Sequence, residues 1–256
     1  MIALALAHDT LEAVDEHPTD DSDQSQWPDT DPKQLDVLLS EPRRILLSFD
    51  GPVCDLFPGR SAPTVVDDLR LLVTNLGMTL PNAFDRVTDP HEYFRWAASS
   101  RHPDLPHLVD QMLTAAELRA AVTAEPTPGV IDFLHACQTS GRTVAIISTR
   151  TSGEAVKSLL ARFGLTRLVS DIAGRHHPTA GSSEPVKTPV WRLLRTLNTE
   201  ATHAVLIGGS DTDIRAAHFA GIRSIGYAPN PDKKKLLAGA RPTMIVAAME
   251  VLTGRP

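Results

Sequence analysis

The sequence predicts an α/β fold in which helices flank a parallel β-sheet. The first observation is a series of short, continuous apolar runs, such as residues 143–147, which are typical of strands buried on both faces. The second is that helical segments of about 10–15 residues separate these runs, which favours parallel strands joined by crossovers. The third is a stretch, residues 60–125, with helical periodicity and no strand-like run. We therefore expect a small helical insertion after the first strand.

The strands are expected where apolar runs end at turn-forming residues. The first, residues 44–49, is broken by Asp50-Gly51-Pro52. The other expected strands are residues 143–147, 168–169, 203–207, 224–227 and a segment near 243–246.

The helices are expected where apolar residues recur at helical spacing between glycine and proline signals. Pro126-Thr127-Pro128-Gly129 opens one helix, and Gly141 closes it. The other expected helices are residues 64–77, 107–124, 153–163, 188–198, 211–220, 231–239 and a terminal segment. No internal repeat is visible. The pattern predicts three parts: an acidic tail over residues 1–42, a core formed by residues 43–59 and 126–256, and a helical cap over residues 60–125.

The charge of the chain is unevenly distributed. The 256 residues carry a net charge of −6, but residues 1–40 hold ten Asp or Glu residues against Lys33 alone, which is −9 and leaves +3 for the rest. A segment so acidic, with little to bury, is expected to be disordered. It is either a solubilising tail or an arm that binds a protein partner. The mildly basic remainder favours anionic ligands, but no Lys/Arg cluster is dense enough to predict nucleic-acid binding.

Composition also limits the cellular setting. Cys54 and Cys137 are the only cysteines, which excludes a disulfide scaffold and favours a reducing compartment. No apolar run approaches the roughly 20 residues that a membrane span needs. The opening apolar residues 1–7 are too short for a signal peptide and lack its basic flank. We expect a cytoplasmic protein that does not contact a membrane.

Polar and glycine residues follow several of the expected strands. In parallel sheets ligands bind beyond the carboxyl ends of the strands, so these residues are expected to converge. They are Ser48, Asp50 and Gly51 after the first strand, Ser148, Thr149 and Arg150 after the second, Gly208, Gly209, Ser210, Asp211 and Asp213 after the third long run, and Lys187 before a helix. Hydroxyls, a lysine and glycine-rich turns at one edge predict a site for phosphate or another oxyanion.

Four of these segments, in this order, resemble the motifs of the haloacid dehalogenase superfamily of phosphatases. They are Ile45-Leu-Leu-Ser-Phe-Asp-Gly-Pro-Val53, Val144-Ala-Ile-Ile-Ser148, Lys187 before a helix, and Val205-Leu-Ile-Gly-Gly-Ser-Asp-Thr-Asp213. The resemblance covers residues 43–252. It implies a Rossmann-like core with a helical cap inserted after the first strand.

The resemblance also implies roles, and two of the residues depart from them. The family's nucleophilic aspartate corresponds to Ser48, and its acid/base aspartate to Asp50. A metal-binding aspartate corresponds to Gly209, which leaves Asp213 and Asp211 as weak candidates for metal ligands. Ser148, with Thr149, Gly51 and Lys187, corresponds to the positions that hold the phosphoryl group.

These departures predict an impaired enzyme. Mg²⁺ prefers an octahedral set of hard oxygen ligands, so losing two carboxylates predicts weak Mg²⁺ binding or none. A serine hydroxyl is a poor nucleophile without a positioned base. The leading hypothesis is a pseudophosphatase that binds a phosphorylated small molecule, a similar anion or a partner. The alternatives are a hydrolase rebuilt around Asp50, Asp211, Asp213 or Ser48, and a shift in register that would make Asp55 the nucleophile.

Other residues have a functional and a structural interpretation. His176 and His177 could suggest a metal, but adjacent side chains in a loop rarely converge on one ion. Cys54 could face the site, although a buried, unreactive thiol is more common. The aromatic residues of the expected cap either line a substrate pocket or form the core of the cap; they are Phe84, Tyr93, Phe94 and Trp96.

Overall fold

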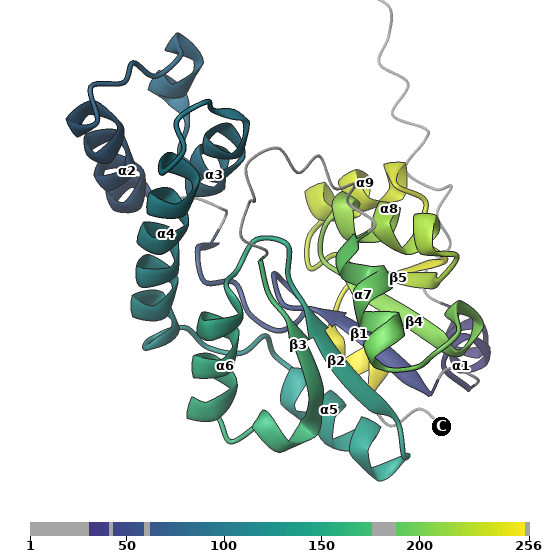
Figure 1. Ribbon diagram of the computed structural model, residues 1–256. Helices are drawn as coiled ribbons and strands as arrows, with labels where there is room; N and C mark the ends of the chain where they lie inside the picture. The colour runs from purple at the N-terminus through teal and green to yellow at the C-terminus, as the bar shows by residue number, and fades with distance from the viewer. Residues whose placement is uncertain (1–30, 41–42, 59–61, 176–187, 254–256) are drawn as a thin grey trace, which may run out of the picture.

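The computed structural model describes residues 31–40, 43–58, 62–175 and 188–253 (Figure 1). Its centre is a parallel sheet of six strands in the order β3-β2-β1-β4-β5-β6. The strands are β1 (Arg44–Ser48), β2 (Thr143–Ile147), β3 (Val169–Ala173), β4 (Ala204–Gly208), β5 (Arg223–Tyr227) and β6 (Met244–Val246). The predicted fold class, a Rossmann-like parallel sheet flanked by helices, is confirmed.

The central strand β1 positions the candidate site. Leu46 on β1 pairs in register with Ala145 on β2 and with Leu206 on β4, so the carboxyl ends of these three strands lie at one edge. The expected strand at residues 143–147 matches β2. The strand expected at residues 168–169 is longer and later, as β3.

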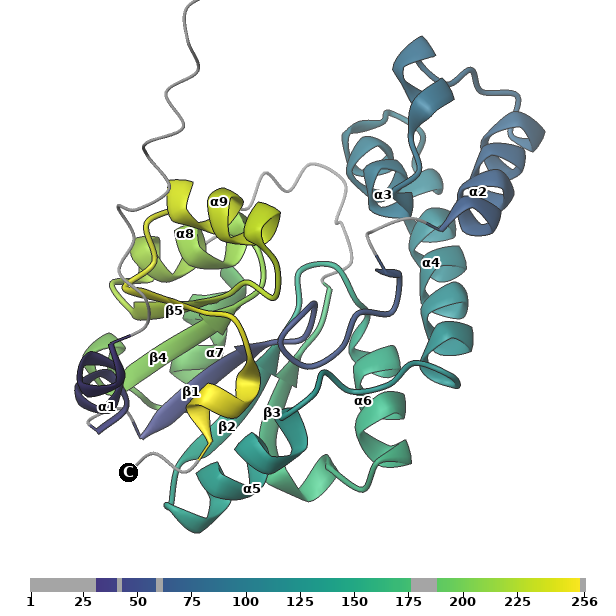
Figure 2. The same cartoon turned by 180° about the vertical axis from the view of Figure 1, so that it is seen from behind.

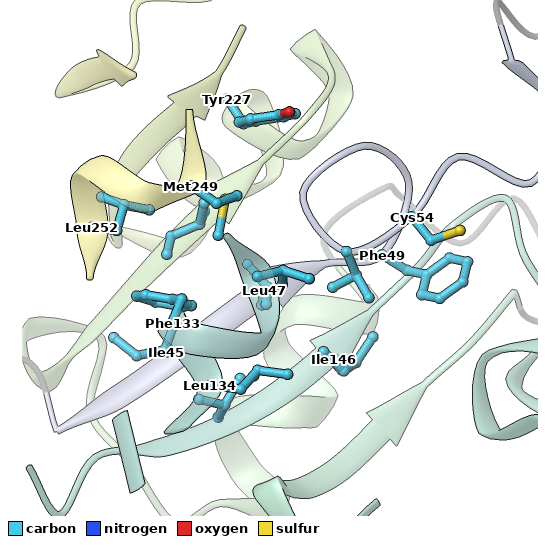
Figure 3. Close-up of a cluster of buried hydrophobic side chains, with 14 of the residues drawn as sticks. Ile45, Leu47, Phe49, Cys54, Phe133, Leu134, Ile146, Tyr227, Met249 and Leu252 are labelled. Carbon is cyan, nitrogen blue, oxygen red and sulfur yellow. The ribbon is translucent and has the colours of Figure 1, made fainter. Parts of the chain in front are cut away.

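Side chains of β1 alternate between the two faces of the sheet. Ile45 and Leu47 are fully buried in a cluster with Phe133 of α5 (Val130–Thr139) and Met249 (Figure 3). Leu46 belongs to the cluster on the opposite face. The first face is covered by α5, α6 (Gly153–Arg162) and the short 3₁₀ helix η6 (Met249–Leu252), which stands where a terminal helix is expected. The second face is covered by α7 (Thr188–Thr196) and α8 (Asp211–Ala220).

The helix α1 (Pro32–Ser40) corrects the prediction of a disordered tail over residues 1–42. Leu35, Leu38 and Leu39 are at most 4 % exposed and belong to the same core cluster as Ile45. Their i, i+3, i+4 spacing forms an apolar stripe that can be buried against the sheet, whatever the charge of the flanking sequence. Arg142 Nη2 also donates to the Leu39 carbonyl at 2.7 Å. The partner-binding role expected of the acidic tail stays a prediction, and residues 1–30 of that tail lie outside the described residues.

Three helices lie between β1 and α5, in the stretch that the sequence assigns to a cap. They are α2 (Pro63–Asn75), α3 (Pro90–Ser99) and α4 (Leu105–Ala121), with the 3₁₀ helix η3 (Asn82–Arg86). Figures 1 and 2 show these helices gathered to one side of the sheet. Leu69, Tyr93 and Leu113, one from each helix, are fully buried in a separate apolar cluster. The proposed division into core and cap rests on this arrangement.

Helix α3 has no counterpart among the helices expected from periodicity. Asp89 accepts a hydrogen bond from the backbone N–H of His91, and Pro90 occupies the first turn, so the helix has a regular N-terminus. Among the residues that the structure describes, no helix has both the length and the apolar composition to cross a bilayer.

Candidate functional site

A pocket of about 50 Å³ lies at the carboxyl edge of the sheet. Asp50, Gly51 and Thr151 line it from the loops that follow β1 and β2, and Ser210 lines it from the loop that follows β4. The rest of the lining is Asp55, Leu56, Phe57, His91, Arg150 and Lys233. The pocket therefore lies where the topology of a parallel sheet predicts a ligand.

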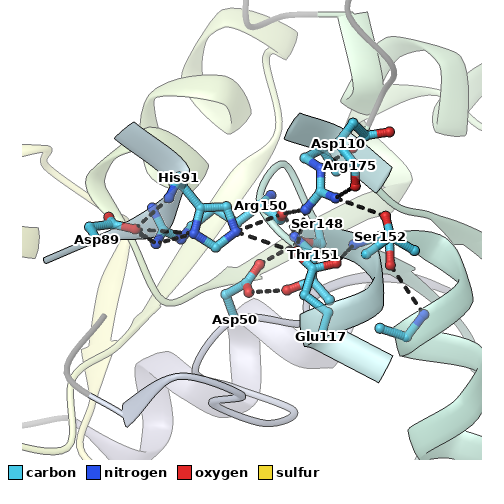
Figure 4. Close-up of polar contacts among 12 residues, drawn as sticks. Asp50, Asp89, His91, Asp110, Glu117, Ser148, Arg150, Thr151, Ser152 and Arg175 are labelled. Atoms are coloured by element: carbon cyan, nitrogen blue, oxygen red, sulfur yellow. Dashed lines mark hydrogen bonds and ion pairs between the residues drawn. The ribbon is translucent and has the colours of Figure 1, made fainter. Parts of the chain in front are cut away.

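Asp50 links the loops that follow β1 and β2. Its carboxylate accepts hydrogen bonds from Ser148 Oγ at 2.5 Å and from Thr151 Oγ1 at 2.7 Å (Figure 4). Ser148 Oγ in turn accepts from the backbone N–H groups of Arg150, at 3.1 Å, and Thr151, at 2.7 Å. The Ser148 hydroxyl thus has three partners, is only 2 % exposed and stands behind the pocket lining. Its contacts order the loop that carries Thr151 into the pocket.

Ser48, at the position of the family's nucleophile, is also buried. It is 2 % exposed and is not part of the pocket lining, and its hydroxyl is one of the neighbours that lower the pKa of Asp213.

Asp213 stabilises the start of α8. Its Oδ2 accepts from the backbone N–H groups of Gly209, at 3.1 Å, and Ser210, at 3.0 Å, and Ser210 Oγ accepts from the Asp213 N–H in a reciprocal capping box. Burial, followed by the nearby Asp50 charge, raises the pKa of Asp213 despite hydrogen bonds from Ser210 and Ser48 that lower it. The carboxylate is therefore committed to backbone contacts.

Gly209 has no room for a side chain. A Cβ built there would meet the carbonyl oxygen of Asp50 and would lie 2.8 Å from Cδ of Pro52. The loop that follows β1 thus occupies the space that an aspartate at position 209 would need. Among the described residues, no three His, Cys, Asp or Glu side chains converge on a common point as a metal site would require. The residues present do not fit the carboxylate-rich octahedral site that Mg²⁺ prefers.

The other predicted site residues lie in different settings. Gly51 lines the pocket with φ of +106°, a conformation that favours glycine. Thr149 is exposed. Asp211 lies in the first turn of α8, where it pairs with Arg215 at 3.6 Å and does not line the pocket. Lys187, His176 and His177 lie outside the described residues.

A polar network that the sequence does not predict joins the inserted helices to the loop after β2. His91, at the start of α3, places Nε2 at 2.9 Å from the Arg150 carbonyl oxygen. Arg150 Nη2 lies 2.9 and 3.0 Å from the two carboxylate oxygens of Asp89. Although burial raises the pKa of Asp89, hydrogen bonds from His91 and Arg150 outweigh it and hold that pKa below its usual range.

The second half of the network is centred on Arg175, whose side chain is 1 % exposed. It pairs with Asp110 at 2.7 Å and with Glu117 (Figure 4). Its guanidinium also lies 5.0 Å from the ring centre of Phe94. Glu117 also accepts from the backbone N–H of Ser152 at 2.9 Å. Burial raises the pKa of Glu117, but hydrogen bonding to His91 and the charge of Arg175 outweigh that effect, so the pKa is lowered overall.

Cys54 and the four aromatic residues of the inserted helices contribute to packing. The Cys54 thiol is buried and donates to the Glu125 carbonyl at 3.3 Å, and burial with the nearby Asp55 and Asp50 charges raises its pKa to about 12. A thiol that stays protonated is a poor nucleophile. The cap aromatics pack with one another outside the pocket lining; Phe84 and Tyr93, for example, stand edge to face with ring centres 4.9 Å apart.

Comparisons with known proteins agree with this architecture. The phosphoglycolate phosphatase of Rhodospirillum rubrum is 25 % identical over 212 residues, covering 74 % of this chain and 83 % of the relative. The phosphoglycolate phosphatase of Agrobacterium fabrum is 28 % identical over 183 residues, covering 64 % and 76 %.

Solved structures share the fold. CbbY from Rhodobacter sphaeroides, solved in complex with phosphate, superposes with a TM-score of 0.60 at 17 % identity, covering 82 % of this chain and 95 % of that one. A haloacid dehalogenase-like family hydrolase from Streptococcus pneumoniae gives 0.57 at 16 % identity, covering 81 % and 94 %. The family of haloacid dehalogenase-like hydrolases matches residues 75–227. The chain therefore belongs to the haloacid dehalogenase-like hydrolase family.

Proposed function

We propose that this protein is a pseudophosphatase, which binds a small phosphomonoester in the pocket at the sheet edge without metal-dependent hydrolysis. The observation that carries the proposal is the closed space at Gly209, where the Asp50 carbonyl and Pro52 stand in the place of a side chain. The phosphatases among its relatives support a phosphorylated small molecule as the ligand.

The loss of a metal ligand explains the expected loss of rate. With glycine at position 209 and the Asp213 carboxylate engaged by two backbone N–H groups, we expect Mg²⁺ to bind weakly or not at all. Phosphoryl transfer depends on metal ions and positioned charge to stabilise its transition state, so this loss alone removes several kcal/mol of barrier reduction.

The position of the nucleophile gives the same result. Ser48 is buried and does not line the pocket. A phosphorus atom in the pocket would therefore not meet the Ser48 oxygen in the observed arrangement. Attack also needs a base to take the serine proton, and a raised Asp213 pKa is compatible with that role only if the side chains rearrange.

Groups that suit anion binding remain at the pocket. Thr151 and Ser210 line it, and Ser210 caps the N-terminus of α8, where the helix dipole favours negative charge. The protein would therefore still bind a phosphomonoester although it no longer hydrolyses one.

A second candidate is an active phosphomonoester hydrolase with a rebuilt site. The observation in its favour is that Asp50, at the acid/base position, is held by Ser148 and Thr151 at the edge of the pocket. In that case Asp50 would activate water, or Asp55, which also lines the pocket, would attack phosphorus.

Steady-state hydrolysis of phosphoglycolate and p-nitrophenyl phosphate in saturating Mg²⁺ separates these candidates. We expect the wild-type rate to equal that of Asp50→Asn, since any residual rate would then come from contaminants. A Mg²⁺-dependent rate that falls at least about a hundredfold in Asp50→Asn, the range attributed to general acid–base catalysis, would establish the hydrolase instead.

A further inference from the structure

We propose that Lys233, with Arg150, provides the positive charge that lets this pocket hold a phosphomonoester dianion without a metal ion. The inference rests on the proposed function and extends it, because it names the group that takes over the electrostatic role of Mg²⁺. The pattern of motifs does not point to Lys233, which is the first of three consecutive lysines in the sequence.

Lys233 reaches the pocket from an element outside the four motifs. It lies in the first turn of α9 (Pro231–Gly239), which follows β5, and its backbone N–H donates to Asn230 Oδ1 at 2.9 Å. Helix α9 packs beside α8, whose N-terminus carries Ser210 (Figure 2). The side chain is half-buried and lines the same pocket as Asp50, Thr151 and Ser210. The first turn of α9 thus places Lys233 at the edge where the motif loops meet.

The described part of the lining carries negative charge that a bound phosphomonoester would meet. Asp50 and Asp55 are both part of the lining, and a phosphomonoester adds up to two further negative charges. Arg150 also lines the pocket and pairs with both oxygens of Asp89. Lys233 supplies a second cation. Its ammonium is a compact charge with three donors, suited to phosphate oxygens.

A lysine also explains why the carboxylates could be lost. A metal ion needs carboxylates to hold it, whereas an ammonium is attached to the chain and needs none. With Ser48 and Gly209 in place of two acids, the site repels a dianion less, and one lysine can offset the acids that remain. Neutral residues at positions 48 and 209 and a lysine at position 233 would thus both favour an anion held without a metal ion.

Calorimetric titration of the full-length protein with inorganic phosphate in EDTA tests the proposal. We expect wild type to bind phosphate. Lys233→Gln should bind phosphate at least about tenfold more weakly, the loss expected when a hydrogen bond to a charged group is removed. Lys233→Arg, which keeps the charge, should keep most of the affinity. Lys235→Gln is the matched control, because it makes the same charge change on an exposed position of the same helix, away from the pocket. It is expected to bind like wild type. Thermal unfolding of each variant verifies that it is folded.

The outcomes separate the inference from the proposed function. Equal affinity in Lys233→Gln and wild type would overturn the role of Lys233 and leave the pseudophosphatase assignment standing. Equal losses in Lys233→Gln and Lys235→Gln would overturn it as well, since the effect would then be one of net charge. Phosphate binding by wild type only when Mg²⁺ is added would overturn it too. Hydrolysis that depends on Asp50 would overturn the proposed function. Even then, a loss of phosphate affinity in EDTA that is confined to Lys233→Gln would support the role of Lys233.

Discussion

The sheet edge and the contact between the inserted helices and the core differ in how they accommodate negative charge. At the sheet edge, serine and glycine stand at positions 48 and 209, where the family pattern places two aspartates, and Asp213 is bound to backbone N–H groups. Between the inserted helices and the core, buried carboxylates are retained: Glu117 is fully buried and faces the buried Arg175. The first region has neutral residues at these two positions, whereas the second has buried carboxylates paired with arginine.

The difference indicates where the structure still depends on charged partners. Buried carboxylates persist where an arginine is in direct contact, because an unpaired buried charge is costly. At the sheet edge a metal ion would have been that partner. Without a metal ion, as we propose, two adjacent carboxylates would repel each other and any anionic ligand, which neutral residues at positions 48 and 209 avoid. The pairing of Arg150 with Asp89 also fixes the inserted helices against the loop after β2.

The largest effect is expected from breaking the charge pairing in the second region. Arg175→Met leaves Asp110 and Glu117 buried without their arginine, which should lower the free energy of unfolding by about 3–5 kcal/mol. Arg175→Lys, which keeps the charge but not the planar fork, should lose less. Urea unfolding measures both.

The matched control for this change is Arg95→Met. Arg95 pairs with Glu92 on the exposed side of α3, where both side chains are more than 40 % exposed, so the cost should stay below about 1 kcal/mol. If the Arg175 and Arg95 variants lost equal stability, the buried network would not hold the inserted helices in place.

A side chain restored in the first region is expected to destabilise the protein. Gly209→Asp forces the new Cβ against the Asp50 carbonyl and Pro52, which should cost about 1–3 kcal/mol, as overpacking does. Gly209→Ala should cost a similar amount, because the clash arises at Cβ. The same urea titration, repeated with Mg²⁺, shows whether the metal stabilises the variant. Full stability of Gly209→Asp together with tight Mg²⁺ binding would mean that the metal site is still open.

The smallest effect concerns acid pH. The pKa of Asp89 is held below its ordinary value of 3.8 in the folded protein, so the stability it contributes is present above that value and is lost as pH falls below it. Asp89→Asn keeps the helix cap but removes this titration, and its stability should fall less steeply in acid, by on the order of 1 kcal/mol. Parallel pH-stability curves for wild type and variant would contradict the assigned pairing with Arg150.

The parts of the fold that local sequence signals determine were predictable. The strand at residues 143–147 matches the structure because a continuous apolar run marks it. The helices at residues 211–220 and 231–239 match because a capping residue, Ser210 or Asn230, directly precedes each of them. Helix α1 was missed because its three leucines are embedded in acidic sequence, where overall charge obscured a short apolar stripe.

The candidate site was predictable only where motifs mark it. Asp50 and Gly51 line the pocket, as their place after a strand predicts. The pairing of Arg175 with Asp110 joins residues 65 positions apart, and no local pattern signals it. Lys233 was missed for a related reason, since nothing within a run of three lysines shows which one faces the pocket.

The central claim is that this protein binds a phosphoryl group without the help of a metal ion. A metal ion that strengthens phosphate binding must itself bind more tightly when phosphate is present. The claim is therefore tested by the ratio of the phosphate dissociation constants without and with Mg²⁺. The measurement is the dissociation constant of wild type for inorganic phosphate, determined in EDTA and again in millimolar Mg²⁺. Our account predicts the same value in both buffers. Affinity higher by about tenfold or more in Mg²⁺, equivalent to about 1.4 kcal/mol of coupling, would contradict it.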